Sequence, residues 1–595
     1  MFEPQKNRVD YGNLLTPPDG FELDFAVCTT YSLDFDAFIG ACMSLGLGED
    51  TESELLNDPI FMLDVLHKTS DKIALFCEGG QIHSPSNVTM LYALLESSVQ
   101  QVSIKEKKGV LFSFHPKFWL ISYKNKNGDK KYSLIVTSRN LTFDRSWDVV
   151  ISLNGYKTNE RVRRNQPVKD FLGFLQGYLA KTPECKHKNR KIQELISDLD
   201  HIEFKTEGNI FDDVDFIPLG IGGEYSIKNY PLFGNEQYHE LFAMSPFLSR
   251  TTVKELNDRW EKSAVKPVLI TRKQSLDEVK GCGNFDVCCM RPEVVYGEEQ
   301  LGGGRVQQQD IHAKLYMIRQ SDRSDAQLYL GSMNASYNAM HGNVEFMVRL
   351  TCKGRHLDLE KLKNQLIYDN DNDHKQNPFE KVDIGSIEVS DKADENLDCV
   401  IRSICRSSAC ARVEQNGEKY NIVLDTKCKE YPCTVTVSPL FSKKVQSFKS
   451  TMTFEDLVLK ELSQFYKIVV VGKEKTVERI IVIPTAGIPE NRDDAVISSI
   501  IPDTKSFYAY LSFVLGNDPV LDAVEATRVL QGVSDGRFSG TEYSAALYEK
   551  MLKAAATDPE KLSGINYLMK AVSKDGIVPD KFIKLYAAFQ KAVKR

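Results

Sequence analysis

The stretches LFSFHPKFWL, residues 111–120, and DIHAKLYM, residues 310–317, decide the fold, because one pattern recurs at matching places in two halves of the chain. Each stretch carries a histidine and, two residues later, a lysine: His115 with Lys117, and His312 with Lys314. Of the ten histidines, only these two are followed by lysine in this way. Because residues i and i+2 of a strand face the same side, we expect two strands that each present an imidazole and an ammonium together.

The elements around the two motifs also recur in the same order. An apolar run, an amphipathic helical stretch and a strand-like segment precede each motif, at residues 25–34, 38–45 and 72–77 in one half and 241–249, 253–256 and 267–271 in the other. After each motif comes a strand that ends in Ser-x-Asn and then an acidic residue that opens one more strand: Ser138, Asn140 and Asp148, or Ser332, Asn334 and Glu345. Strands that alternate with helices predict an α/β protein with two sandwich halves.

The repeat ends near residue 390. Residues 395–500 read as mostly β, and residues 503–595 have helical periodicity. We therefore expect four domains: residues 1–205 and 206–392 for the two halves, 393–502 for a mostly β accessory domain, and 503–595 for a helical C-terminal domain. We find no catalytic constellation in the last 200 or so residues.

The composition is that of a globular protein. The chain has 595 residues, of which 42% are apolar and 26% charged, and this excludes fibrous and wholly disordered chains. No window approaches the ~18 apolar residues of a membrane span. The first residues, MFEPQK, lack the apolar stretch of a signal peptide. We expect a soluble cytoplasmic protein with no membrane partner.

Five of the thirteen cysteines fall within 35 residues: Cys399, Cys405, Cys410, Cys428 and Cys433. They contain no C-x2-C pair, and no histidine lies between the first and the last of them. Cysteine is among the most buried residue types. Reduced core thiols are therefore favoured over a zinc site.

The charge is unevenly distributed. The chain carries a net charge of −7, yet residues 101–191 hold 20 basic against 7 acidic residues. Such asymmetry favours one face suited to a polyanion. The lysine-rich residues 124–131 read as a hairpin tip, whereas Arg139, Arg161, Arg163 and Arg164 are expected to bind nucleic acid.

The duplicated residues suit chemistry at a phosphate. Two lysines and two asparagines that converge on one point supply charge and hydrogen bonds to phosphate oxygens. One histidine attacks phosphorus as a nucleophile, and the other protonates the leaving oxygen and then deprotonates water. Asp148 and Glu345 are expected to fix the histidine tautomers, within or across the halves, with Ser138 and Ser332 in support. No metal or other cofactor is needed, because the protein itself supplies the positive charge.

Over roughly residues 10–390 the chain resembles the phospholipase D superfamily, in which an H-x-K…N…E/D motif occurs twice around a pseudo-two-fold axis. It departs from the H-x-K-x4-D form, since Ser122 and Arg319 stand at the aspartate positions, and in this it is similar to tyrosyl-DNA phosphodiesterases and metal-independent nucleases. The resemblance implies a covalent phosphohistidine on His115, with His312 as acid and base. Residues 29–34 and the helical tail are also similar to bacterial defence-associated phospholipase D-like proteins found beside helicases in phage-defence clusters, which implies a helicase partner.

The substrate is argued separately from the superfamily. The basic segment contains the first motif, so a nucleic-acid phosphodiester is favoured, with DNA preferred to RNA as the partner. Two alternatives stay open: a scaffold that binds nucleic acid without turnover, and hydrolysis of phospholipid or another small phosphodiester. The sequence carries no signal for the oligomeric state.

Overall fold

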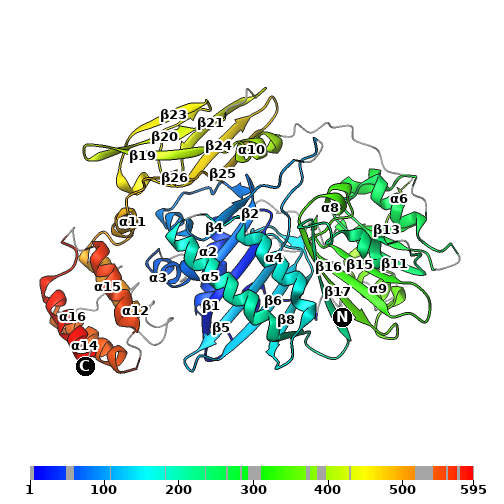
Figure 1. Cartoon of the computed structure of the whole chain (residues 1–595), viewed down its shortest axis with the longest axis horizontal. Coiled ribbons are helices and arrows are strands. Elements are labelled where there is room, and N and C mark those ends of the chain that lie inside the picture. The colour runs from blue at the N-terminus through cyan, green and yellow to red at the C-terminus, as the bar shows by residue number, and fades with distance from the viewer. Residues whose placement is uncertain are drawn as a thin grey trace.

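The computed structural model describes residues 6–47, 59–106, 109–180, 182–234, 236–262, 265–281, 284–292, 310–369, 376–384, 397–427, 431–515, 540–557, 560–572 and 576–593. It is a mixed α/β structure built around two large sheets (Figure 1). In that view a smaller β region lies above the first sheet, and a group of C-terminal helices lies beside the first sheet.

The first sheet belongs to the N-terminal half. Its strands, in spatial order, are β4 (Val99–Val102), β2 (Ile73–Glu78), β1 (Phe21–Thr30), β5 (Phe118–Asn125), β6 (Lys130–Thr137), β8 (Val150–Lys157) and β9 (Ile202–Lys205). The first three strands of this order are parallel to one another, and each later pairing is antiparallel. The apolar runs of β1 and β2 are buried on both faces, as expected for strands at the centre of a layered fold.

The second sheet repeats this strand order. Its strands are β10 (Asp213–Leu219), β17 (Glu345–Cys352), β16 (Ala326–Gly331), β15 (Leu315–Arg319), β11 (Glu240–Met244), β12 (Val268–Ile270), β13 (Asp286–Met290) and β18 (Phe379–Lys381). The six strands from β13 to β17 correspond in order and in pairing sense to the six from β4 to β8. The recurring sequence elements therefore occupy equivalent places in two sheets.

One hydrophobic core joins the inner faces of both sheets. Alternate residues of the central strands, such as Phe25 of β1 and Phe242 of β11, enter this core together with α4 (Gln166–Gln176) and α5 (Pro183–Asp198). The outer face of the first sheet packs on α2 (Phe35–Leu47) and α3 (Pro59–Thr69). The outer face of the second packs on α6 (Arg250–Asp258). Both sheets are thus fixed against each other, which positions the loops at their shared end.

The β region after residue 397 starts with the helix α10 (Asp398–Cys405) and contains two further sheets. They are built from β19 (Cys410–Asn416), β20 (Lys419–Asp425), β23 (Thr451–Leu457) and β26 (Thr485–Ala486), and from β21 (Thr434–Pro439), β22 (Gln446–Ser447), β24 (Phe465–Val471), β25 (Thr476–Val482) and β3 (Ile82–His83). The strand β3 comes from the N-terminal half and pairs with β25. The second of these sheets is therefore completed by the first half of the chain.

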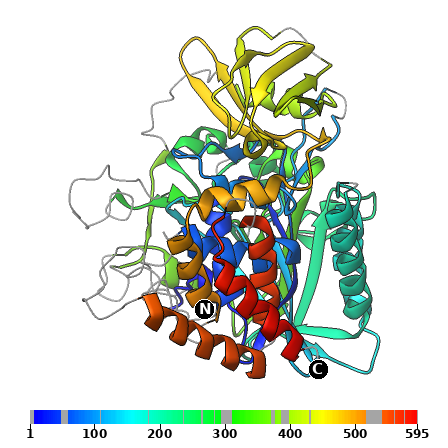
Figure 2. The ribbon, with the colours of Figure 1, turned by 90° about the vertical axis from the view of Figure 1, so that its left-hand side faces the viewer.

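The C-terminal helices are α11 (Arg492–Ile500), α12 (Thr504–Leu515), α14 (Gly540–Thr557), α15 (Glu560–Val572) and α16 (Asp580–Val593). Figure 2 shows them stacked in front of the first sheet. Their apolar side chains join the same hydrophobic cluster as α2 and α3. The Tyr510 hydroxyl also donates to Asp64 of α3 at 3.3 Å. These helices are thus an outer layer of the first half.

The H-x-K segments are not strands, contrary to expectation. The strand β5 begins only at Phe118, after Lys117, and β15 begins only at Leu315, after Lys314. Pro116 has no N–H to give to a ladder, and the backbone N–H of both His312 and Ala313 donates to Trp147. The motif residues therefore lie in short irregular segments that lead into the strands, and Lys117 and Lys314 fold back onto their own histidine carbonyls.

The clustered cysteines only partly match the expectation of buried thiols. Cys399, Cys405 and Cys433 are half-buried and Cys410, the first residue of β19, is exposed. The core interpretation is therefore wrong for Cys410, and Cys428 lies outside the described residues. In the ranges given above, no helix combines the length and apolar character needed to cross a membrane.

Candidate active site

The two motif histidines lie where the halves exchange short backbone contacts. The strand β14 (Asp310–Ile311) pairs with β7 (Ser146–Trp147), and Phe114 forms a bridge with Val344. The His115 N–H donates to the Val344 carbonyl at 2.8 Å, and the His312 N–H donates to the Trp147 carbonyl at 3.0 Å. Each histidine is thus anchored to the residue that precedes the acid of the other half.

The acids reach the histidines across the two halves. The Nδ1 atom of His115 lies 2.8 Å from Oε2 of Glu345, and Nδ1 of His312 lies 3.3 Å from Oδ1 of Asp148. A carboxylate at Nδ1 fixes the tautomer that carries hydrogen there and leaves Nε2 with a free lone pair. The pairing that the sequence left open is therefore reciprocal.

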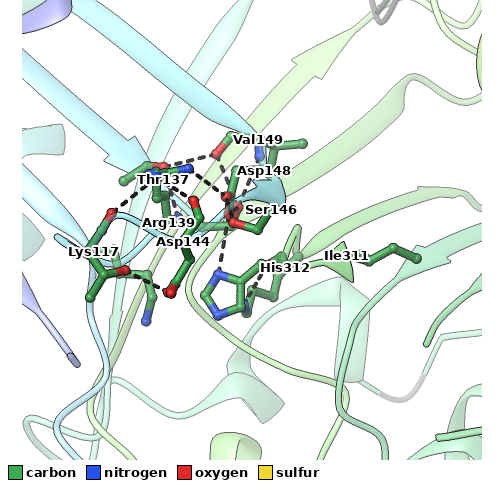
Figure 3. A network of polar contacts seen from close by, with 12 residues as sticks. Lys117, Thr137, Arg139, Asp144, Ser146, Asp148, Val149, Ile311 and His312 are labelled. Atoms are coloured by element: carbon green, nitrogen blue, oxygen red, sulfur yellow. Dashed lines mark hydrogen bonds and ion pairs between the residues drawn. The ribbon is translucent and has the colours of Figure 1, made fainter. Parts of the chain in front are cut away.

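Serine and asparagine side chains hold the two carboxylates in place. Ser138 donates to Asp148 Oδ1 at 2.7 Å, and Ser146 donates to the other oxygen of this carboxylate (Figure 3). Around Glu345, the donors are Ser332 at Oε2 and Asn343 at Oε1, the latter at 3.2 Å. The two seryl residues of the Ser-x-Asn motifs thus occupy matching positions.

The lysines are fully buried and their charges act across the site. Burial lowers the pKa of Lys117 to about 7, against the attraction of Glu345 and Asp148. Burial and the charge of Lys117 lower the pKa of Lys314 well below its usual value. Each ammonium also lowers the pKa of the histidine of the other half. These mutual effects show that the two lysines and the two histidines lie close enough to influence one another, and a bound phosphate would favour the charged form of both lysines.

Both histidines are neutral at pH 7 in the free protein. Burial lowers the pKa of His115 to about 4, against the opposing attraction of Glu345. Burial and the Lys314 charge lower the pKa of His312 to about 3. Burial raises the pKa of Asp148, but hydrogen bonds from His312, Ser146 and Ser138 outweigh this effect and hold it below the usual range. A neutral imidazole beside an ionised carboxylate is the form needed for nucleophilic attack.

The two motif asparagines carry buried acceptors that lack a hydrogen-bond partner within the described ranges. These are Oδ1 of Asn140 and Oδ1 of Asn334, at equivalent positions of the two halves. Most buried polar atoms are paired, and an unpaired one indicates a functional position. These two oxygens can accept a hydrogen bond, and the NH₂ group of each amide is the part that can donate to an anionic ligand.

Residues outside the motif brace the segment before each histidine. The Glu78 carboxylate accepts from the Phe114 N–H at 2.6 Å, and the Arg272 guanidinium donates to the Ile311 carbonyl at 2.7 Å. Glu78 is the last residue of β2, and Arg272 lies two residues after the end of β12, the corresponding strand of the second sheet. The sequence indicated neither residue, because an acidic and a basic residue at equivalent positions of the two halves do not form a recognisable repeat.

The helix α10 extends this brace into the accessory region. Arg402 donates to Glu78 at 3.1 Å and to the Phe112 carbonyl at 2.8 Å, and Arg406 donates to the same carbonyl at 3.1 Å. Burial raises the pKa of Glu78 to about 7, against the attraction of Arg402. The backbone that leads into His115 is thus held by side chains almost 300 residues away in the sequence.

Three of the arginines expected to bind nucleic acid lie away from the motif residues, and their part in binding stays a prediction. Arg161, Arg163 and Arg164 follow the far end of β8, whose seven steps from Val150 to Lys157 span about 23 Å. Arg161 pairs with Asp200 at 3.2 Å, and Arg164 pairs with Asp213. The positive segment is therefore spread along the sheet and partly neutralised by acids outside it.

Arg139 does lie at the site, but its guanidinium contacts the protein. It donates to the carbonyls of Thr142 and Asp144 at 3.1 and 2.6 Å, and lies 3.8 Å from Asp148 (Figure 3). Arg139 therefore ties the loop after Asn140 to the carboxylate that holds His312.

The acids of the site do not form part of a metal-ligand cluster among the described residues. Within the described ranges, no three His, Cys, Asp or Glu side chains gather in a way that could hold a metal ion. Asp148 and Glu345 each bind a histidine instead. Metal-independent chemistry stays a prediction for experiment.

Comparisons with known proteins add little to the site geometry. No protein-family model matches the chain, and no curated protein matches its sequence. Among solved structures it is similar to yeast tyrosyl-DNA phosphodiesterase, with 13% identity, a TM-score of 0.33, and coverage of 59% of this chain and 89% of that one. It is also similar to polyphosphate kinase from Porphyromonas gingivalis, with 11% identity, a TM-score of 0.28, and coverage of 62% and 50%. Likenesses of this degree do not assign an activity.

Proposed function

We propose that this protein is a phosphodiesterase that hydrolyses nucleic acid through a phosphohistidine, without a metal ion, as a branch of the phospholipase D superfamily. One observation carries the proposal: each motif histidine binds the acid of the other half through Nδ1. The same kind of contact therefore leaves the lone pair of each Nε2 atom free. A pair of histidines in matching states beside two lysines suits displacement at one phosphorus. Two halves related by a pseudo-two-fold axis account for the matching contacts.

In the first step, Nε2 of His115 attacks phosphorus and the bond to the leaving oxygen breaks. His312 gives that oxygen the proton on its Nε2. The free protein keeps His312 neutral. The negative charge of a bound phosphodiester raises the pKa of this imidazole, so its Nε2 takes up a proton from solvent water before the attack. Lys117, Lys314 and the two asparagine amides stabilise the charge on the non-bridging oxygens.

In the second step, water attacks the phosphorus of the phosphohistidine. His312, now neutral, takes a proton from the water as the new P–O bond forms and the N–P bond breaks. His115 leaves as a neutral imidazole whose Nδ1–H is held by Glu345. His312 releases the proton that it took from the water to solvent when the phosphomonoester leaves, so the protein returns to its starting state.

A nucleic-acid substrate is supported by the excess of basic residues in the segment that contains the first motif. Arg161, Arg163 and Arg164 follow the far end of β8, whereas Lys117, Lys314, Arg139 and Arg272 lie at the site. Action in phage defence with a helicase partner rests on the sequence resemblance alone, and co-purification with a helicase from the native host tests it.

The experiment is trapping of the adduct with thymidine 5′-p-nitrophenyl phosphate and with a labelled oligonucleotide. After quenching in denaturant at neutral or alkaline pH, digestion and mass spectrometry locate the phosphorylated peptide. His115→Ala should abolish both turnover and adduct, whereas His312→Ala should accumulate adduct with the nitrophenyl ester, whose leaving group needs no proton. His201→Ala, an exposed histidine near the far end of β8, is the matched control.

Phosphate on the peptide that contains His312 would reverse the assignment of nucleophile and acid. Tight binding of oligonucleotide with no turnover of any phosphodiester would favour the scaffold. Turnover of phospholipid vesicles without turnover of nucleic acid would favour the alternative that the protein hydrolyses phospholipid.

A further inference from the structure

Exposed aromatic rings flank the site at equivalent positions of the two halves. Phe143 follows the motif residue Asn140 by three positions, and Tyr337 follows Asn334 by three. Their exposed fractions are 64% and 51%. A single exposed ring is common on protein surfaces, but a matched pair beside a duplicated site is not explained by chance exposure.

The backbone that carries each ring is held in the same way. The Phe143 N–H donates to the Asp34 carboxylate at 3.1 Å, and the Tyr337 N–H donates to the Ser249 hydroxyl at 2.9 Å. Asp34 and Ser249 are themselves equivalent, because their N–H groups donate to the carbonyls of Leu141 and Ala335, respectively. Both rings are thus presented by fixed loops.

These loops are tied to the reacting groups. Arg139 joins the loop before and after Phe143 to Asp148, which holds His312. On the other side, the short helix α8 (Tyr337–His341) lies between Asn334 and Asn343 in the chain, and Asn343 donates to Glu345. Three residues of chain span at most about 11 Å. The backbone of each ring residue therefore lies within about 11 Å of the motif asparagine of its own half.

A third exposed aromatic ring lies beside a positively charged side chain near the same site. Of the described phenylalanines, only Phe143 and Phe247 are exposed, and Phe247 is 49% exposed on the loop after β11. The Arg272 guanidinium lies 4.8 Å from the centre of this ring and donates to Ile311, next to His312. A cation over an aromatic ring is a surface that stacks bases and binds phosphates.

We propose that Phe143 and Tyr337 are stacking platforms for the bases on either side of the scissile phosphate, which makes the substrate a single-stranded polynucleotide. The inference rests on the proposed function. In a duplex both faces of each base are already stacked on neighbouring bases, so no face is free to stack on these rings. Base–aromatic stacking tolerates any sequence, because every base has a π-face. Cleavage should accordingly show little sequence preference.

The test measures binding of fluorescent 12-nucleotide DNA and RNA strands to the full chain in the His115→Ala background, which does not consume them. Phe143→Ala and Tyr337→Ala should each weaken binding by about 5-fold to 150-fold, the range expected for one stacked base. Tyr337→Phe should bind like the parent, and Phe143→Leu should be weakened, because it keeps apolar bulk without a ring. Tyr156→Ala is the matched control: this tyrosine is 55% exposed near the far end of β8.

A strand with abasic positions on both sides of the central phosphate separates stacking from other losses. The parent should bind it more weakly than the normal strand, and the two alanine variants should bind it as the parent does. Equal losses on the abasic strand, a loss in Tyr156→Ala of the same size, or unaltered binding by both variants would overturn the inference. Loss of binding to anionic phospholipid vesicles in place of oligonucleotide would reassign the rings to a membrane surface.

Failure of the inference is distinguishable from failure of the proposed function. If the wild-type chain cleaves single and double strands alike and the ring variants have no effect, only the platforms are wrong. If the wild-type chain neither binds nor cleaves any polynucleotide, the proposed substrate itself is wrong. A difference between the DNA and RNA arms assigns the sugar without changing either conclusion.

Discussion

Replacing Glu345 by Gln tests the reciprocal arrangement most directly, because the change keeps the size of the side chain and removes its charge. The Ser332 hydroxyl accepts from the Phe346 N–H at 3.0 Å, so its one hydrogen goes to Glu345 Oε2, where the His115 Nδ1–H also points. On the other oxygen, Asn343 donates with its amide, since its carbonyl is taken by the Ser113 N–H at 2.9 Å. All three neighbours of this carboxylate are therefore donors.

A glutamine at this position cannot satisfy three donors. If its oxygen faces His115 and Ser332, its NH₂ meets the NH₂ of Asn343. If it is turned over, its NH₂ faces His115 and selects the tautomer with hydrogen on Nε2, which cannot attack phosphorus. A hydrogen bond to a charged group contributes about 1.5–3 kcal/mol, which corresponds to a loss of roughly 10-fold to 150-fold in the rate of the first step.

The assay is single-turnover release of p-nitrophenolate from thymidine 5′-p-nitrophenyl phosphate. This leaving group needs no proton, so the measured rate reports attack by His115 alone. Asp148→Asn should leave this burst largely intact and slow the later hydrolysis, because Asp148 holds His312. The control is Asp215→Asn. It removes a carboxylate of the strand β10 that pairs with Arg349 of β17, the strand that begins with Glu345. An unchanged burst in Glu345→Gln, or an equal loss in Asp148→Asn, would refute the assignment of the two acids.

Three further outcomes are expected. Cleavage should persist in EDTA, because the site's lysines supply the positive charge; complete loss that is reversed by added Mg²⁺ would contradict this reading. Since burial lowers the pKa of His115 to about 4, the folded state excludes a proton that the unfolded chain binds below about pH 6.5, so the free energy of unfolding falls as the pH drops. Denaturant unfolding at pH 6.5 and pH 5 measures this fall in the free energy of unfolding. The fall should be smaller in His115→Gln than in the wild type, by about 2 kcal/mol; equal falls in the two proteins would place this histidine in a wetter environment. Joint replacement of Arg161, Arg163 and Arg164 by alanine should leave cleavage of a 12-nucleotide strand within twofold of wild type, since they lie at the far end of β8; a tenfold loss would extend the binding surface along the sheet.

Local patterns were sufficient to predict the elements of the two halves. The apolar runs before each motif, the helical stretches and the strands that end in Ser-x-Asn all appear at or within a few residues of the expected ranges, as in β1, α2, β6 and β16. Periodicity is a property of neighbouring residues, so it survives in a single sequence. The mostly β character of residues 395–500 and the helical tail were predicted for the same reason.

Long-range contacts explain what the sequence did not predict. The His115 and His312 segments leave the strand conformation because their backbone hydrogen bonds go to Val344 and Trp147, which are far away in the chain. The crossed pairing of Asp148 and Glu345 is likewise invisible in residue types, which are the same for either pairing. A charge count could not show that Arg161 and Arg164 pair with Asp200 and Asp213, outside the counted segment.

The link from α10 to the nucleophile determines how the chain can be divided. A protein shortened after residue 392 would lose Arg402 and Arg406 and leave Glu78, whose pKa burial already raises to about 7, as an isolated carboxyl that takes up a proton. It would also strip β3 of its neighbour β25. These contacts indicate that the two halves and the region that follows them stabilise one another. Under the proposed function, random mutagenesis that selects for lost cleavage should therefore return substitutions in α10 as well as at the motif residues.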